Sequence, residues 1–270
     1  MKIKLIRIAI WAIATWIVSC AIASFSTSWL PANSPIINAI IGTIVSALYE
    51  FIDTHGYGIR LWFDSQIRYA NTSIRISFSY LYRIEVDGKY LLVRGNRLKN
   101  QYQPVGGVYK YYREAKSFLD SIDAIPDQKM ENSDDSDDLR LLIKGKYLLS
   151  FLDWFFSMVN REYDPMREFR EELIDSELLP VGDFSRIEYR KVKTKKGNIN
   201  YSKFNCCNEL LLSDIFEIVL SDSQQKAIRN AVDNHPAELC LASVDEIKKL
   251  CYGGIQKNLG TNTPWILGEE

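Results

Sequence analysis

The first part of the chain carries an uncharged run that limits its possible folds more than any other feature. From Ile8 to Tyr49 there is no Asp, Glu, Lys or Arg over 42 residues. A single helix of that length would measure about 63 Å, roughly twice the thickness of the hydrocarbon core of a bilayer. Two prolines and an asparagine interrupt the run between residues 31 and 35. The sequence therefore predicts two membrane spans, near residues 5–25 and 35–51.

These spans would form a transmembrane hairpin over residues 1–52. The basic residues at its two ends are Lys2, Lys4, Arg7, Arg60 and Arg68. By the positive-inside rule, both ends of the hairpin are expected in the cytoplasm. Residues 53–72, which mix apolar and charged side chains, are expected to form a juxtamembrane connector along the membrane surface.

An alternative reading of the first span stays open. The basic residues Lys2 to Arg7, the apolar stretch after them and Ala21-Ile22-Ala23 also fit a secretory signal with a small-residue cleavage site. Ile17-Val18-Ser19-Cys20 loosely resembles a lipoprotein cleavage box. The second uncharged span favours the retained hairpin.

Composition limits the remaining function classes. The chain has 270 residues, 47% of them apolar, which is enough for one sizeable core plus an appendage. Its 33 basic and 34 acidic residues give a net charge of −1, so nothing marks it as a binder of nucleic acid polymers. The five cysteines show no CxxC spacing, which argues against a structural zinc site or a disulfide framework and favours a reducing compartment.

The segment 73–270 is expected to be the second domain. Apolar residues alternate from Ile74 to Val86, which predicts a long strand, and Asp87-Gly88 predicts a tight turn into a second strand. Gln103 to Gly107 is expected to be a loop. Ser243 to Glu246 forms a capping box that opens a helix. Strands and helices in mixed order predict an α+β fold, with an α/β/α sandwich as its arrangement.

A glutamate-rich helix carries the strongest hint of chemistry. Asp164 to Leu179 is predicted to be helical, with Asp164 as its cap and Pro165 in its first turn. Glu168, Glu171 and Glu172 then share one face, where like charges repel each other unless a cation binds. Mg²⁺ prefers such hard oxygen ligands. The alternative is a solvated acidic face neutralised by Arg167 and Arg170.

Together, the bend at Gly106-Gly107 and the sequence Arg167-Glu168-Phe169-Arg170-Glu171-Glu172 resemble the two halves of a Nudix box. The resemblance implies that Glu168, Glu171 and Glu172 hold Mg²⁺ at a diphosphate. It further implies that Glu168 is the catalytic residue that activates water, that Arg167 orients the carboxylates, and that Gly106 and Gly107 contact the ligand.

The box departs from the usual pattern in two ways. Gly107 and Arg167 are 60 positions apart, which implies an insertion near residues 108–160, and Leu173 is followed by Ile174 where a glycine is expected. Glu162 is a candidate to replace the missing upstream glutamate. Whether the domain is an enzyme is therefore left open.

The whole chain more narrowly resembles the two-pass Nudix effectors of bacterial CBASS antiphage signalling. That family implies a cyclic nucleotide ligand made by a partner cyclic-nucleotide synthetase (a CD-NTase). It also implies a hairpin in the bacterial inner membrane and membrane disruption that kills the infected cell. A homo-oligomer through the spans is a separate expectation. The alternative function is a membrane-tethered, Mg²⁺-dependent Nudix pyrophosphohydrolase acting on nucleoside diphosphate derivatives.

Overall fold

The structure is a computed structural model that describes most of the chain after residue 34. The described ranges are residues 35–95, 101–127, 137–256 and 258–268. The chain divides into two compact units, Met1–Phe63 and Asp64–Glu270. The predicted span near residues 5–25 lies outside the described residues.

The described part of the first unit is one helix, α2 (Pro35–Phe63), which is 29 residues long. It covers the predicted span 35–51 and continues into the predicted connector 53–72. Within the described ranges, no helix has both the length and the hydropathy that crossing a membrane requires. The two-span hairpin therefore stays a prediction.

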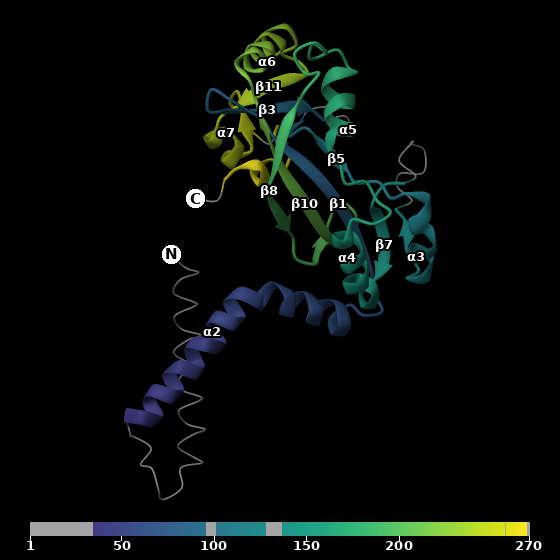
Figure 1. The fold of residues 1–270 in the computed structure, drawn as a ribbon, viewed down its shortest axis with the longest axis vertical. Coiled ribbons are helices and arrows are strands. Elements are labelled where there is room, and N and C mark those ends of the chain that lie inside the picture. Colours follow the sequence, from purple (N-terminus) through teal and green to yellow (C-terminus); the bar gives the residue numbers. More distant parts are fainter. Residues whose placement is uncertain (1–34, 96–100, 128–136, 257, 269–270) are drawn as a thin grey trace, which may run out of the picture. The chain divides into compact units, whose positions relative to one another are not determined.

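The second unit is built around a mixed sheet of seven strands. Its central pair is β1 (Ser73–Arg83) and β10 (Cys207–Val219), which run parallel with Ile74 opposite Asn208. Figure 1 shows these two strands side by side. The other five strands pair antiparallel with their neighbours; they are β5 (Gly106–Val108), β6 (Ile125–Pro126), β7 (Arg140–Lys144), β8 (Glu188–Lys196) and β9 (Asn200–Ser202).

Strand β1 buries one of its faces completely, as its alternating pattern predicts. Phe78, Tyr80 and Tyr82 are fully buried. The ring of Phe78 packs against Phe155 of α4 (Leu148–Ser157), with centroids 4.6 Å apart. The ring of Tyr82 packs against Phe169 of α5 (Met166–Phe169), at 5.7 Å. The glutamate-rich helix therefore packs against this face of the sheet.

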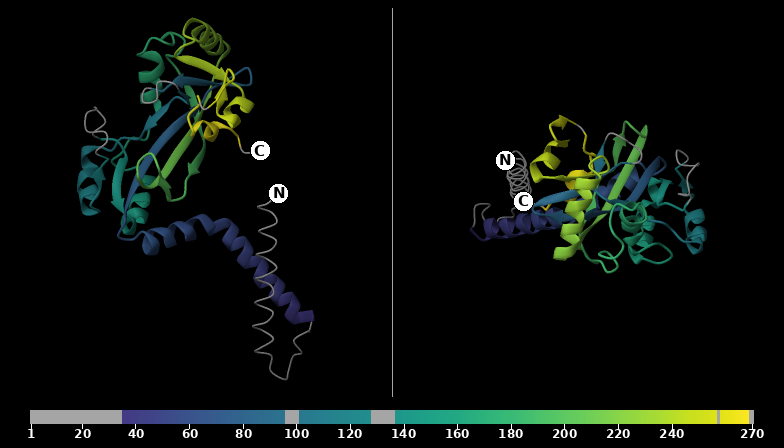
Figure 2. Two further views of the ribbon diagram at one scale, coloured as in Figure 1. Left: turned by 180° about the vertical axis from the view of Figure 1, so that it is seen from behind. Right: turned by 90° about the horizontal axis from the view of Figure 1, so that it is seen from above.

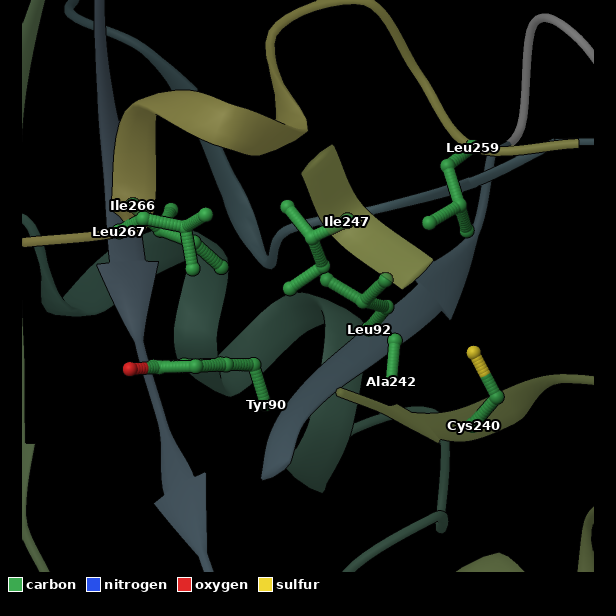
Figure 3. Packing of buried hydrophobic residues seen from close by; sticks show 8 residues of the cluster. All are labelled: Tyr90, Leu92, Cys240, Ala242, Ile247, Leu259, Ile266 and Leu267. Atoms are coloured by element: carbon green, nitrogen blue, oxygen red, sulfur yellow. The ribbon is translucent and has the colours of Figure 1, made fainter. Parts of the chain in front are cut away.

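A smaller sheet and the C-terminal helices form a second core. The strands are β2 (Glu85–Val86), β3 (Lys89–Arg94), β4 (Tyr102–Gln103) and β11 (Leu239–Ala242). The predicted turn at Asp87-Gly88 joins β2 to β3, with positive φ at both residues. The predicted capping box at Ser243 is also present and opens α7 (Val244–Lys249). Figure 3 shows how Leu92, Ala242 and Ile247 pack here.

The α+β class that the sequence predicts is confirmed, and two features add to it. The segment 108–160 does not stand apart from the sheet: β7 pairs with β1, and α4 packs on it. Helix α6 (Asp222–Asn234), which lies next to β11 in Figures 1 and 2, was not predicted.

The remaining described elements are short. They are η1 (Asp64–Arg68), η2 (Arg113–Ala115), α3 (Lys116–Ser121), η4 (Gly145–Tyr147), η5 (Arg170–Ile174), β12 (Cys251–Tyr252), β13 (Ile255–Gln256) and η6 (Thr263–Ile266).

Candidate functional site

The glutamate-rich helix is shorter than predicted and changes type halfway. It begins as α5 at Met166, whose backbone N–H donates to the Asp164 side chain at 3.0 Å. From Arg170 it continues as the π-helical turn η5, in which the Asp175 N–H donates to the Arg170 carbonyl five residues back. The predicted helix from Asp164 to Leu179 thus extends too far at its C-terminal end, since helical turns cover residues 166–174, whereas at its start Asp164 accepts a backbone N–H as a capping side chain does. A π turn inside a helix is frequent at functional sites.

Two buried side chains fix the face that this helix turns toward the sheet. Phe169 and Leu173 are both fully buried. Glu168 and Glu172 are partly buried next to the glycines of β5, whereas the Glu171 side chain is 52% exposed. All three carboxylates line the same cavity. The helix therefore presents them together, close to Gly106 and Gly107, which precede them by more than 60 residues in the sequence.

Gly106 and Gly107 lie in strand β5 and not in the predicted loop. They pair with Leu81 and Tyr80 of β1. At Gly106 φ is +154°, and a Cβ there would come within 2.2 Å of the Tyr80 carbonyl oxygen. Both observations require glycine at this position.

Gly107 makes room for a side chain of the helix. A Cβ at this position would lie 2.1 Å from the carboxyl carbon of Glu168. The backbone N–H of Gly106 donates to the Glu172 carboxylate at 3.2 Å. The two glycines therefore hold the carboxylates of the helix, and the predicted ligand contact of Gly106 and Gly107 stays a prediction.

Arg167 joins three carboxylates through its guanidinium group. It donates to Glu162 at 3.0 Å, to Glu168 at 2.7 Å and to Glu171 at 3.1 Å. A further bond, at 3.1 Å, goes to the backbone carbonyl of Val108 in β5. Burial alone would lower the pKa of Arg167, but its hydrogen bond to Glu162 and the neighbouring negative charges outweigh burial and raise the pKa. Arg167 is charged here and restrains the carboxylates geometrically.

Glu162 connects two segments of the site, which its position in the sequence did not indicate. Its backbone N–H donates to the Lys110 carbonyl at 2.8 Å, and its carboxylate accepts the Lys110 N–H at 3.1 Å. The neighbouring Arg161 is buried, with its guanidinium 3.9 Å from the ring centroid of Phe155. Sequence spacing could suggest Glu162 only through the Nudix resemblance, because its partners Lys110 and Arg167 come from different segments.

A buried tyrosine lies beneath this cluster. Tyr80 is fully buried, and its hydroxyl has no hydrogen-bond partner among the described residues. Burial raises its pKa, and the negative charge of Glu162 adds to that effect. The pattern of β1 predicted Tyr80 as core, so its place under the carboxylates was not foreseen.

Burial shifts the protonation of two glutamates. It raises the pKa of Glu168, although Arg167 opposes the shift. It raises the pKa of Glu172 to about 8, and the charges of Glu168 and Glu171 add to the rise, while the Gly106 N–H opposes it. Two carboxyl groups with raised pKa values beside a cavity are a frequent property of binding and catalytic sites.

The cavity beside these glutamates has a volume of about 610 Å³. Glu168, Glu171 and Glu172 line one side, and Arg94 and Glu238, from the ends of β3 and the start of β11, line another. The volume is in the usual range for small-molecule sites. Four glutamates against one arginine make this an acidic cavity.

The carboxylates that line this cavity are of the chemical kind that binds divalent cations. Carboxylate oxygens are hard ligands for Mg²⁺, and a cation would offset the burial that raises the pKa values of Glu168 and Glu172. Across the described ranges, however, no group of three or more His, Cys, Asp or Glu side chains is arranged to hold a metal ion. Arg167 engages Glu168, and Gly106 engages Glu172, so these side chains would have to change partners to converge on an ion.

The chain was also compared with models of known protein families. The family model described as SMODS-associated NUDIX domain matches residues 73–267, which begin at β1 and include every residue of the site. Comparisons with curated proteins and with solved structures found no match.

Proposed function

The chain belongs to the SMODS-associated NUDIX domain family, and from this premise we propose that it is the membrane-attached effector of a CBASS antiphage system. In this proposal, the second unit binds a cyclic oligonucleotide made by a partner cyclic-nucleotide synthetase. The hairpin at residues 1–52, with both ends on the cytoplasmic side of the bacterial inner membrane, then disrupts that membrane, and the infected cell dies.

The acidic cavity is the observation that carries the proposal. A nucleotide phosphate would be repelled by the ionised glutamates of this cavity unless a cation lay between them. Glu168, Glu171 and Glu172 would hold this ion, and Gly107 leaves the space that Glu168 needs. When bound, Mg²⁺ supplies the positive charge that phosphate oxygens require.

Arg167 and Glu162 have positioning roles in this proposal. Arg167 keeps Glu168 and Glu171 on the cavity side, and Glu162 keeps Arg167 in place through two oxygen atoms. Ligand binding that draws Glu168 toward an ion would weaken its bond to Arg167. The site thus has a contact that differs between its free and bound states, as any ligand-driven conformational change requires.

The uncharged run from Ile8 to Tyr49 supports the membrane part of the proposal. Its second half is helical from Pro35 onward, and Gly42 and Ser46 are small residues of the kind that helix pairs in lipid use at close contacts. We propose that ligand binding changes the association or tilt of the spans in a homo-oligomer.

A membrane-tethered pyrophosphohydrolase is the second candidate. The pKa of Glu168 is raised, and its carboxylate lies beside the cavity, so it could accept a proton from a water molecule that attacks a diphosphate phosphorus. The bond from that phosphorus to the bridging oxygen would break, and the leaving phosphate would carry the bridging oxygen. The match to a NUDIX domain family and the retained Arg167-Glu168 pair favour this candidate.

One pair of assays on the full-length protein separates the two candidates. Calorimetry in Mg²⁺ would measure binding of cyclic di- and trinucleotides, and mass spectrometry would measure cleavage of ADP-ribose and related nucleoside diphosphate compounds. Glu168→Gln is the test variant, and Glu188→Gln, an exposed glutamate on β8, is the matched control. Binding without cleavage supports the effector, while cleavage without binding contradicts it.

The membrane step has its own test. The full-length protein is reconstituted into dye-loaded vesicles of bacterial lipid, and the cyclic nucleotide that binds is then added. The proposal predicts dye release from vesicles with the parent protein and far less release with Glu168→Gln. Equal release with and without the nucleotide would contradict a ligand-controlled membrane step.

A further inference from the structure

A second cavity adjoins the glutamate cavity. It has a volume of about 500 Å³, and Leu178 lines both cavities. One wall is a face of helix α6, and the other is the chain segment 177–183 that follows the glutamate-rich helix. Figure 1 shows this part of the chain, after α5, beside α6.

The face of α6 in this cavity has an apolar floor and a polar edge. Ala227 and Ala231 are buried and four residues apart, so they form a flat strip along the helix. Lys226, Asn230 and Asn234 are exposed and follow the same strip at helical spacing. The cavity is also lined by Glu177, Asp183 and His235, whose side chains add hydrogen-bonding groups around the same floor. An apolar floor ringed by amide, carboxylate and imidazole groups, with one ammonium group at its edge, matches a nucleobase, which has flat apolar faces, a hydrogen-bonding edge and a phosphate nearby.

The opposite wall is held in place before any ligand binds. The amide of Gln224 on α6 donates to the carbonyls of Asp183 and Arg186, both at 3.0 Å. Leu179 and Phe184, which flank the exposed part of this wall, are buried at 2% and 5% exposure. Because both ends are fixed, little conformational entropy would be lost when a ligand enters.

The same wall connects the second cavity to the glutamates. The backbone N–H of Leu179 donates to the carbonyl of Leu173 at 2.7 Å, so the wall starts directly from the last turn of the glutamate-rich helix. The two cavities therefore share Leu178, and the segment that lines the second is anchored to the helix that lines the first. Each falls within the size range of a small-molecule site.

We propose that the second cavity is a nucleobase subsite, and that the ligand is an oligonucleotide whose neighbouring units occupy both cavities. Asn230 and Asn234 bind the edge of the base, Ala227 and Ala231 contact its face, and Lys226 binds the adjoining phosphate. The inference rests on the proposed effector function and adds to it a reason why a single nucleotide is a poor ligand, since it would fill one cavity only.

The test compares ligands of different length on the full-length protein in Mg²⁺. Calorimetry measures binding of AMP and of cyclic di- and trinucleotides that carry adenine, guanine, cytosine or uracil. Lys226→Ala removes the ammonium group, and Asn230→Trp fills the subsite from an exposed position. Lys249→Ala, an exposed lysine on α7, is the control. Melting temperatures of all variants check that each is folded.

The proposal predicts that at least one cyclic oligonucleotide binds the parent about tenfold more tightly than AMP does. Lys226→Ala and Asn230→Trp should each weaken that binding about tenfold, whereas Lys249→Ala should leave it unchanged, because the first removes a charge-assisted hydrogen bond to phosphate and the second fills the subsite. Oligonucleotide binding that neither variant weakens would overturn the subsite and leave the effector function standing. Absence of binding by every nucleotide would contradict both.

Discussion

The substitution Glu172→Gln tests the electrostatic reasoning about the site. Glu172 is partly buried, accepts the Gly106 N–H at 3.2 Å and has its pKa raised to about 8 by burial. Glutamine keeps the shape of the side chain and an oxygen acceptor for Gly106, but it carries no charge. The variant therefore isolates the free-energy cost of ionising this one carboxyl group.

The direction of the pH effect follows from proton binding. The ordinary pKa of a glutamate is 4.5, so between about pH 4.5 and about pH 8 the folded parent holds a proton that the unfolded chain has released. The free energy of unfolding of the parent should therefore fall as pH rises through this window. The stability that protonated Glu172 contributes is complete below the lower value and lost above the upper one.

The size of the effect can be bounded. One pKa unit corresponds to about 1.4 kcal/mol, so the full shift would correspond to about 5 kcal/mol. Glu172 keeps some contact with solvent, which reduces this figure, and we expect about 2 kcal/mol. Relative to the parent, Glu172→Gln should thus gain about 2 kcal/mol between about pH 4.5 and about pH 8.5.

The assay is urea unfolding of parent and variant across that pH range, in the same detergent and without divalent ions. The difference between the two proteins is used because most other titrating groups cancel in it. Added Mg²⁺ should then raise the stability of the parent at high pH and affect the variant less. A stability difference that is constant with pH, or that changes in favour of the parent as pH rises, would refute the reasoning.

Three substitutions test the packing around the glutamates. Gly107→Ala places a Cβ 2.1 Å from the Glu168 carboxyl carbon, and the Glu168 side chain can rotate away from it. We therefore expect about tenfold weaker Mg²⁺-dependent nucleotide binding by calorimetry. The melting temperature should stay within a few degrees of that of the parent. Gly106→Ala instead meets the backbone carbonyl of Tyr80 at 2.2 Å with φ at +154°, so we expect about 3 kcal/mol less stability by urea unfolding. Arg167→Met leaves its carboxylate partners without a cation and should cost about 2–3 kcal/mol by the same assay; an unchanged unfolding midpoint would contradict its structural role.

Local patterns in the sequence predicted the local features of the fold. The alternation from Ile74 to Val86 gave the buried face of β1, with a break after Arg83 where the chain passes to the second sheet. The Asp87-Gly88 turn and the capping box at Ser243 are also where their residue types place them. Each depends on neighbours within a few positions, which a sequence displays directly.

Features that depend on distant contacts could not be predicted in this way. Strand β1 pairs with β10 more than 120 residues later, and no local pattern specifies that register. Helix α6 has only a narrow apolar strip, with Ala227, Ile228 and Ala231 buried, so its periodicity is weak. The signal that could have revealed it is the capping box formed by Ser221 and Gln224.

In the candidate site too, local spacing predicted some features, whereas others depend on contacts between distant segments. The spacing of Glu168, Glu171 and Glu172 predicted a shared face, and all three line one cavity. The π turn at Arg170 and the role of Glu162 depend on packing against β1 and β5, so spacing alone could not supply them. Gly106 and Gly107 were expected at a loop because paired glycines usually mark one, whereas here they let a strand lie against a helix.

The most direct test of the central claim is calorimetric titration of cyclic di- and trinucleotides into the full-length protein, with Mg²⁺ and then with a chelator. We expect binding in Mg²⁺ that the chelator abolishes. We also expect Glu171→Gln, at a side chain that is 52% exposed, to weaken this binding without lowering the melting temperature. Equally tight binding with the chelator, or in Glu171→Gln, would contradict a carboxylate-held cation at the nucleotide.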